Sequence, residues 1–151
     1  MRTVEKIKKK DMSKVLEMLR RHEGCETHAY SCTSNKLTIG CGRNIDPAGG
    51  TGLTDHEINY LLQNDINRVI AELTNEFAWF SELNEPRRDA MINICFNMGL
   101  TRLRLFRLAL GAMQNHDYNT AAAEFLNSKW SKQVGNRAIE VALMIKTGNY
   151  Q

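Results

Sequence analysis

The feature that most constrains this chain lies in its first third, where a helical pattern ends at an acidic residue and two short extended runs follow. Four apolar residues recur at three- and four-residue steps, as on one face of an amphipathic helix: Val15, Leu16, Met18 and Leu19. Gly24, directly after Glu23, predicts the end of that helix. The polar segment 34–36 predicts the loop of a β-hairpin. Such a loop places Cys32 opposite Thr38, so we expect Glu23, Cys32 and Thr38 to converge on one cleft.

These residues resemble a signature of the bacteriophage-type lysozymes, which are also called muramidases or endolysins. In that signature, eight residues separate a Glu from an Asp, or in some branches a Cys. Five more residues then precede the Thr of a Thr-x-Gly-x-Gly run. This chain has Glu23, Cys32 and Thr38 at those positions, with Gly40 and Gly42 in register. It therefore departs from much of the family at the middle position, where Cys replaces Asp.

Further similarities to the same family follow in order along the chain and extend the resemblance over roughly residues 13–150. They lie at residues 53–54, 61–65, 87–88, 92–99, 128–130 and 135–138. Many relatives have His directly after the second glycine of the signature, whereas this chain has Arg43. The similarity therefore spans nearly the whole sequence rather than one motif.

The resemblance implies an α+β, mainly helical, lysozyme-like fold. It consists of a small lobe with a β-hairpin and a larger helical lobe, joined by a long helix. We expect a basic N-terminal extension over residues 1–12 and one lysozyme-like domain over 13–151. Within that domain, the small lobe is expected over about 13–53, the connecting helix over about 54–75 and the helical lobe over about 76–151.

Local patterns support helices in the expected places. Thr54 and Glu57 have the spacing of a capping box, which predicts the start of a helix. Asn84, two residues before a proline, predicts the N-cap of another helix. Apolar residues on every side of the following segment, 90–98, predict the buried centre of the larger lobe. We also expect Trp130 in the core and Asn136 as an N-cap.

Charge is concentrated at the N-terminus, where residues 1–14 carry a net +4 against +3 for the whole chain. We interpret this basic segment as a solvated extension, with an anionic cell-wall polymer or nucleic acid as the alternative partner. No aromatic residue lies among its lysines, so base stacking is not available and nucleic-acid binding is not expected. The segment has no apolar core of a secretory signal, and no apolar run approaches the ~20 residues of a membrane span.

The four cysteines are Cys25, Cys32, Cys41 and Cys95. In a chain without a recognisable signal we expect reduced thiols, because the cytoplasm opposes disulfide formation. The alternative is a zinc site formed by Cys25, His28, Cys32 and Cys41. Paired Cys-x2-Cys knuckles are absent, which disfavours zinc, and no metal or cofactor is expected.

The resemblance assigns catalysis to Glu23, Cys32 and Thr38. Cleavage of a glycosidic bond needs an acid for the leaving oxygen and a group that meets the oxocarbenium-like carbon. Glu23 is the expected general acid. Three roles stay open for Cys32: a thiolate base that activates water, a nucleophile, or a neutral thiol that helps to hold water. The family inverts configuration, which favours water activation, and Thr38 is expected to position that water.

The resemblance also implies substrate contacts in the larger lobe. Phe96 and Asn97 are expected to bind sugar, together with Arg43 from the small lobe. Asn93 and Asn97 lie one helical turn apart and are alternatively a pair of satisfied polar groups. Arg137 is expected to orient Glu23, with a plain surface role as the alternative.

We expect the chain to hydrolyse the β-1,4 bond between N-acetylmuramic acid and N-acetylglucosamine in bacterial peptidoglycan, for host cell lysis. The alternatives are a lytic transglycosylase, which works with a single Glu, and a catalytically silent peptidoglycan-binding module. We expect a monomer that stays in the host cytoplasm before lysis. Because the substrate lies outside the cytoplasmic membrane, release through a holin pore is expected.

Overall fold

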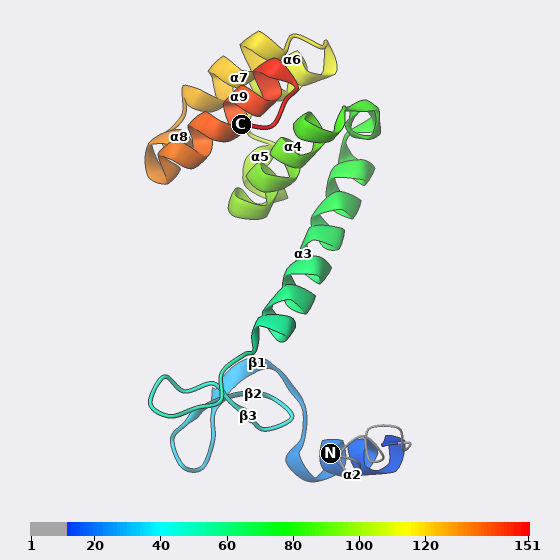
Figure 1. The fold of residues 1–151 in the computed structure, drawn as a ribbon, viewed down its shortest axis with the longest axis vertical. Coiled ribbons are helices and arrows are strands. Elements are labelled where there is room, and N and C mark those ends of the chain that lie inside the picture. Colours follow the sequence, from blue (N-terminus) through cyan, green and yellow to red (C-terminus); the bar gives the residue numbers. More distant parts are fainter. Residues whose placement is uncertain (1–11) are drawn as a thin grey trace. The chain divides into compact units, whose positions relative to one another are not determined.

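The computed structural model describes residues 12–151, so the expected extension over residues 1–12 lies, apart from Met12, outside the described residues. Two compact units follow one another along the chain, a small unit that ends at Ile58 and a helical unit from Asn59 to Gln151 (Figure 1). The described residues form helices and one small antiparallel sheet. This confirms the α+β, mainly helical fold.

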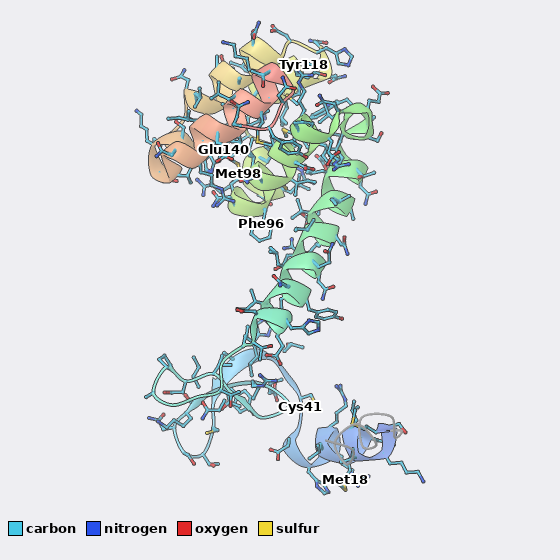
Figure 2. All side chains as sticks on the ribbon, in the orientation of Figure 1. Met18, Cys41, Phe96, Met98, Tyr118 and Glu140 are labelled. Atoms are coloured by element: carbon cyan, nitrogen blue, oxygen red, sulfur yellow. A yellow bond between two sulfur atoms is a disulfide. The ribbon has the colours of Figure 1, made fainter. Side chains whose placement is uncertain are left out.

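The small unit begins with helix α2, Ser13–Glu23. The helix ends where the apolar pattern predicts, because Gly24 takes a φ of 69° and its amide N donates to the carbonyl O of Arg20 at 3.1 Å. Its apolar side chains, such as Leu16 and Met18, are exposed, and Figure 2 labels Met18. Glu23 is therefore the last residue of a helix that buries none of its own side chains.

A three-stranded antiparallel sheet follows, in the order β1-β2-β3. Its strands are β1, Glu26–Ser31; β2, Leu37–Gly40; and β3, Arg43–Asn44. The hairpin of β1 and β2 was expected from the sequence. The short third strand, in which Arg43 pairs with Ile39, was not.

The register of the hairpin differs from the expected one. Thr38 pairs with Tyr30, and the amide N of Cys32 donates to the carbonyl O of Lys36 at 3.0 Å. Asn35 takes a φ of 56°, the left-handed conformation that closes a three-residue hairpin loop. The loop is therefore 33–35 rather than 34–36, and the prediction that Cys32 lies directly opposite Thr38 is wrong. The two are diagonal neighbours on one face of the sheet instead.

Helix α3 runs from Asp55 to Glu76, close to the expected helix over about 54–75. The predicted capping box is present. The amide N of Glu57 donates to Oγ1 of Thr54 at 3.2 Å, and the amide N of Thr54 donates to Oε2 of Glu57 at 2.8 Å. This reciprocal pair fixes the start of α3 at the end of the small unit.

The helical unit packs around its last helix, α9, which contacts α4, α7 and α8 (Figure 1). Its elements after α3 are η1, Ala78–Glu82; α4, Glu85–Met98; α5, Leu100–Leu103; α6, Arg107–Gln114; α7, Tyr118–Leu126; α8, Lys129–Val134; and α9, Asn136–Thr147. One continuous hydrophobic core joins these helices and the end of α3. The described elements of this unit are therefore all helical, and the division into lobes stays a prediction.

Helix α4 lies in this core, as the all-round apolar pattern predicts. Ala90, Met91 and Ile94 are fully buried, and Oδ1 of Asn84 caps the helix by accepting from the amide N of Arg87. Phe96 departs from the prediction, because its side chain is 41% exposed and stands away from the helix (Figure 2). The core therefore covers one side of α4 and leaves the side of Phe96 open.

The prediction of a core tryptophan is confirmed, since Trp130 is only 2% exposed. The predicted cap of α9 is wrong by one residue. The N-cap is Gly135, with a φ of 60° and a ψ of −123°, and Asn136 is the first helical residue. Gly135 also ends α8, so one residue turns the chain between two helices, in a conformation that glycine adopts without strain.

Arg87 ties α4 to the end of α9. Its Nε donates to the carbonyl O of Ile145 at 2.7 Å, and its Nη2 donates to that of Lys146 at 3.3 Å. Its guanidinium lies 3.7 Å from the centre of the Tyr118 ring. A cation at a helix C-terminus satisfies carbonyls that have no partner within the helix. Arg87 therefore links three helices of the core.

We predict that Arg87→Ala lowers the free energy of unfolding of the helical unit by about 2 kcal/mol, because it removes charged hydrogen bonds to helix-end carbonyls. Denaturant unfolding followed by tryptophan fluorescence measures this, since both tryptophans, Trp79 and Trp130, lie in that unit. Arg102→Ala is the matched control. The Arg102 side chain is exposed and has no hydrogen bond or ion pair within residues 12–151, so its loss should cost under about 0.5 kcal/mol. Equal effects of the two substitutions would contradict this account.

Candidate active site

The carboxyl group of Glu23 lies against a glycine of the hairpin. A β-carbon built on Gly42 would lie 3.1 Å from Oε2 of Glu23, and Gly42 has a φ of 81°. Glycine permits both this backbone conformation and this close approach. The Glu23 side chain is exposed and forms no hydrogen bond or ion pair within the described part of the chain. The structure therefore brings an accessible carboxyl group to the glycine run that follows Thr38.

Cys25 and Cys41 form a disulfide, with a Cα–Cα distance of 4.4 Å (Figure 2 labels Cys41). The expectation that all four cysteines are reduced thiols is therefore wrong. The pairing Glu26↔Gly40 brings their neighbours Cys25 and Cys41 opposite each other at the open end of the hairpin. The zinc alternative loses two of its ligands to this bond, and residues 12–151 contain no cluster of three or more metal-ligating side chains.

Cys32 has a free, half-buried thiol at the end of the hairpin. Hydrogen bonds from the backbone of Lys36 and then Ser34 lower the pKa of this thiol, against the opposing effect of burial. Hydrogen-bond donors stabilise the thiolate, so a larger fraction of Cys32 is ionised near neutral pH than in an ordinary cysteine.

Thr38 is the one buried polar side chain among the described residues, at 3% exposure. Its Oγ1 donates to the carbonyl O of Lys36 at 2.9 Å. Since this bond uses the hydroxyl proton, the oxygen lone pairs are left to accept. Cys32 and Thr38 therefore form one polar cluster on the hairpin, although not by the direct pairing that was expected.

Arg43 is held by the start of α3. Its Nη2 and Nη1 bind the Glu57 carboxylate at 2.6 and 3.0 Å, and Nη1 also donates to the carbonyl O of Gly52 at 3.0 Å. The guanidinium, followed by the amide N of Thr54, lowers the pKa of Glu57 to about 2. Sequence analysis missed this ion pair, because Glu57 was explained by the capping box alone. A substrate contact by Arg43 stays a prediction.

The helical unit contains a largely apolar pocket of about 500 Å³. Residues of α3, α4 and α9 line it: Leu62, Ile66, Ile70, Arg88, Asp89, Ile92, Asn93, Phe96 and Arg137. Two of the residues expected at the site, Phe96 and Arg137, thus lie at one pocket. Its size is sufficient for a small ligand or part of a larger one.

Two asparagines of α4 are hydrogen-bonded within the helical unit. Oδ1 of Asn97 accepts from Nε1 of Trp130 at 2.8 Å, and Oδ1 of Asn93 accepts from Nε of Arg137 at 2.7 Å. Both carbonyl oxygens are therefore satisfied. This agrees with the alternative that Asn93 and Asn97 are a pair of satisfied polar groups. The side-chain NH₂ of Asn97 forms no hydrogen bond within residues 12–151. The orientation of Glu23 by Arg137 stays a prediction.

No helix of the described chain is both long and apolar enough to cross a bilayer.

A family model described as phage lysozyme matches residues 20–145 of this chain. An endolysin of Acyrthosiphon pisum secondary endosymbiont phage 1 is 32% identical over 119 aligned positions, covering 79% of this chain and 78% of the endolysin. The Dictyostelium discoideum protein named "Probable T4-type lysozyme 1" is 24% identical, covering 91% and 96%. The pre-baseplate central spike protein Gp5 of Enterobacteria phage T4 is 28% identical, covering 89% of this chain and 28% of that protein.

We predict that Glu57→Gln lowers the melting temperature at neutral pH. Glutamine preserves the capping box, so the variant removes the ion pair with Arg43 alone. The pKa of Glu57 is lowered in the folded protein, so its stabilising effect is present above its ordinary pKa and is lost as pH falls toward about 2. The difference in melting temperature between the two proteins should therefore shrink between about pH 4.5 and 2.

Asp55→Asn is the control for this series. Asp55 is an exposed acid in the same first turn of α3, without an ion pair among the described residues. Its replacement should change the melting temperature less at neutral pH. A Glu57→Gln effect that is the same at pH 3 and pH 7 would contradict the role of the ion pair.

Proposed function

Because this chain belongs to the phage lysozyme family and is a lysozyme-type endolysin, we propose that it hydrolyses peptidoglycan with Glu23 as its general acid. The bond cleaved is the β-1,4 linkage between N-acetylmuramic acid and N-acetylglucosamine. The observation that carries this assignment is the approach of the Glu23 carboxyl group to Gly42, in the glycine run that follows Thr38. An exposed acid next to an open glycine backbone can reach the oxygen of a bound glycan.

In the proposed reaction, Glu23 donates its proton to the leaving glycosidic oxygen as the bond to the anomeric carbon breaks. Cys32, as a thiolate, accepts a proton from a water molecule, whose oxygen attacks the anomeric carbon from the opposite side. An inverting reaction of this kind needs about 6.5–9.5 Å between the two groups to admit the water. Return of the proton from Cys32 to Glu23 through solvent completes the cycle.

The environment of Cys32 supports its role as a base. Backbone donors at Lys36 and Ser34 lower the pKa of its thiol, so the ionised form that accepts a proton is favoured. Thr38 supports the same step, because its oxygen lone pairs can accept a hydrogen bond from the attacking water while its proton is bound to Lys36. A transglycosylase needs no such water-activating cluster.

We assign the substrate contacts to residues with free surface or free donors. The exposed ring of Phe96 offers an apolar face to a sugar, and the free NH₂ of Asn97 offers a donor to an acetamido group. Arg43 and Arg137 are assigned to binding and to the orientation of Glu23 by family resemblance. Each is already hydrogen-bonded, to Glu57 and to Asn93 respectively, which holds its guanidinium in a defined position.

We further propose that the protein acts as a monomer and reaches the wall from the host cytoplasm through a holin pore. The endolysin among its relatives supports this route. The peptidoglycan substrate lies beyond the cytoplasmic membrane, so an enzyme made inside the host needs a passage to it.

We predict that Glu23→Gln reduces the clearing of a peptidoglycan suspension by about 10²–10⁴-fold, because glutamine keeps the size of the side chain but has no proton to donate to the leaving oxygen. Sedimentation with purified peptidoglycan should show unchanged binding. Glu26→Gln replaces an exposed acid three residues further along the chain and should keep near wild-type activity. A Glu23→Gln variant as active as the Glu26→Gln variant would refute the assignment.

We predict that wild-type activity rises with pH as the Cys32 thiol ionises. Cys32→Asp should flatten this rise, because a carboxylate is already ionised, and Cys32→Ala should lose most activity while staying folded. Alkylation should abolish wild-type activity through Cys32 alone, because Cys95 is buried and burial raises its pKa to about 11. Mass spectrometry of the labelled peptides checks this selectivity. Full activity of Cys32→Ala would limit Cys32 to packing.

A further inference from the structure

We propose that the Cys25–Cys41 disulfide is a positioning pair for the Glu23 carboxyl group, and that full lysozyme activity requires this bond to be formed. The inference rests on the proposed role of Glu23 as the acid. It assigns a function in catalysis to two cysteines that do not themselves contact the reacting atoms.

The disulfide joins the two chain segments that bring Glu23 and Gly42 together. Cys25 follows Glu23 by two residues, and Cys41 directly precedes Gly42. A β-carbon built on Gly42 would lie only 3.1 Å from Oε2 of Glu23. A small shift of either segment therefore changes the distance between the Glu23 carboxyl group and Gly42. The disulfide therefore constrains both the segment that carries Glu23 and the segment that Glu23 contacts.

Both segments need such a constraint, because a glycine directly precedes Cys25 and a glycine lies on each side of Cys41. Gly24 has a φ of 69°, and Gly40 and Gly42 have φ values of 65° and 81°. Glycine has the widest choice of backbone conformations, so these links are the least restricted part of the site when no cross-link is present. The disulfide removes that freedom at the point where the acid is placed.

Among residues 12–151, few non-covalent contacts hold the end of α2. Helix α2 buries none of its side chains, and the Glu23 side chain has no hydrogen bond or ion pair among residues 12–151. The hairpin is also irregular here, because a register shift separates the pair Glu26↔Gly40 from the regular pairing that begins at Tyr30. The covalent bond is thus the strongest constraint between the end of α2 and β2.

The bond also encloses the other proposed catalytic residues. Residues 26–40, which lie between Cys25 and Cys41, contain Cys32 and Thr38. Closing this loop restricts how far the segment with the proposed base can move relative to the segment with the acid. Misplacement of a catalytic group by about 1 Å can cost on the order of 10²-fold in rate. A lower kcat is therefore the expected consequence of opening the disulfide.

Cys25 and Cys41 are both exposed. Reagents can therefore reduce and re-form the disulfide in the folded protein. Reduction by dithiothreitol converts the disulfide to two thiols and oxidises the reagent to its cyclic disulfide. Reoxidation by glutathione disulfide transfers two electrons from the Cys25 and Cys41 thiols, which lose their protons, and releases two molecules of reduced glutathione. The state of the pair can therefore be set in the intact chain and verified by counting thiols.

The test compares the wild-type protein with a Cys25→Ala/Cys41→Ala double variant, on soluble peptidoglycan fragments. Circular dichroism at the assay temperature establishes that both proteins are folded. We expect kcat of the double variant to be about tenfold or more below that of the oxidised wild type, with KM changed less than about twofold. Dithiothreitol should lower the wild type to the level of the variant and leave the variant unchanged, and glutathione disulfide should restore only the wild type.

Gly42→Ala provides a second, independent test. The added methyl group crowds Oε2 of Glu23 and is strained at a φ of 81°, so it displaces the same carboxyl group with the disulfide intact. Gly42→Ala should therefore lower kcat even when the Cys25–Cys41 disulfide is oxidised. If the reduced wild type and the double variant keep the oxidised kcat and lose only thermal stability, the disulfide is a structural cross-link and the inference is wrong. That result leaves the role of Glu23 standing, which the Glu23→Gln variant decides separately.

Discussion

The backbone pairing of β1 with β2 is the constraint on which the small unit depends. The pair Glu26↔Gly40 brings Cys25 to Cys41, and the pair Tyr30↔Thr38, beyond a register shift, brings the Cys32 sulfur to the amides of the loop. A slip of one residue reverses the face on which every side chain of a strand lies. Such a slip would separate the disulfide partners and remove Cys32 from Thr38. The positions of the acid and of the proposed base therefore both follow from the pairing of one hairpin, on either side of its register shift.

Within each unit, the side chains considered for the site divide into those that are bonded to their neighbours and those that are free. The Glu57 carboxylate caps α3 and binds Arg43, while Oδ1 of Asn97 is used by Trp130. By contrast, the Glu23 carboxyl group has no described partner, and the Phe96 ring is exposed. The free groups, Glu23 and Phe96, are expected to meet the substrate directly, and the bonds of Arg43 and Asn97 hold these side chains in defined positions.

Much of the fold could be predicted because it depends on local signals. The end of α2 at Gly24, the capping box at Thr54 and the N-cap at Asn84 each arise within one helical turn, and all three are confirmed. The hairpin register could not be read with the same certainty, because it depends on Asn35 adopting a left-handed conformation. Polar composition predicts a loop but not which of its residues takes that conformation.

The site was harder to predict where one side chain has two bonding partners, or where residues far apart in the sequence are in contact. The ion pair of Arg43 with Glu57 joins residues 14 positions apart, and Glu57 already had a sufficient local explanation. The disulfide was missed because cysteine chemistry was argued from the cellular compartment, and because the expected register does not pair residue 26 with residue 40. The pairing of residue 26 with residue 40 contains that signal, since the next positions outward are Cys25 and Cys41.

The central claim is that water, activated beside Cys32 and Thr38, replaces the glycosidic oxygen at a bond protonated by Glu23. Digestion of purified peptidoglycan in ¹⁸O-labelled water, followed by mass spectrometry of the released fragments, tests it most directly. We expect reducing N-acetylmuramic acid ends that each carry one ¹⁸O atom from the solvent. Unlabelled 1,6-anhydro-muramic ends would contradict it, because they form by attack of the sugar's own hydroxyl group without water.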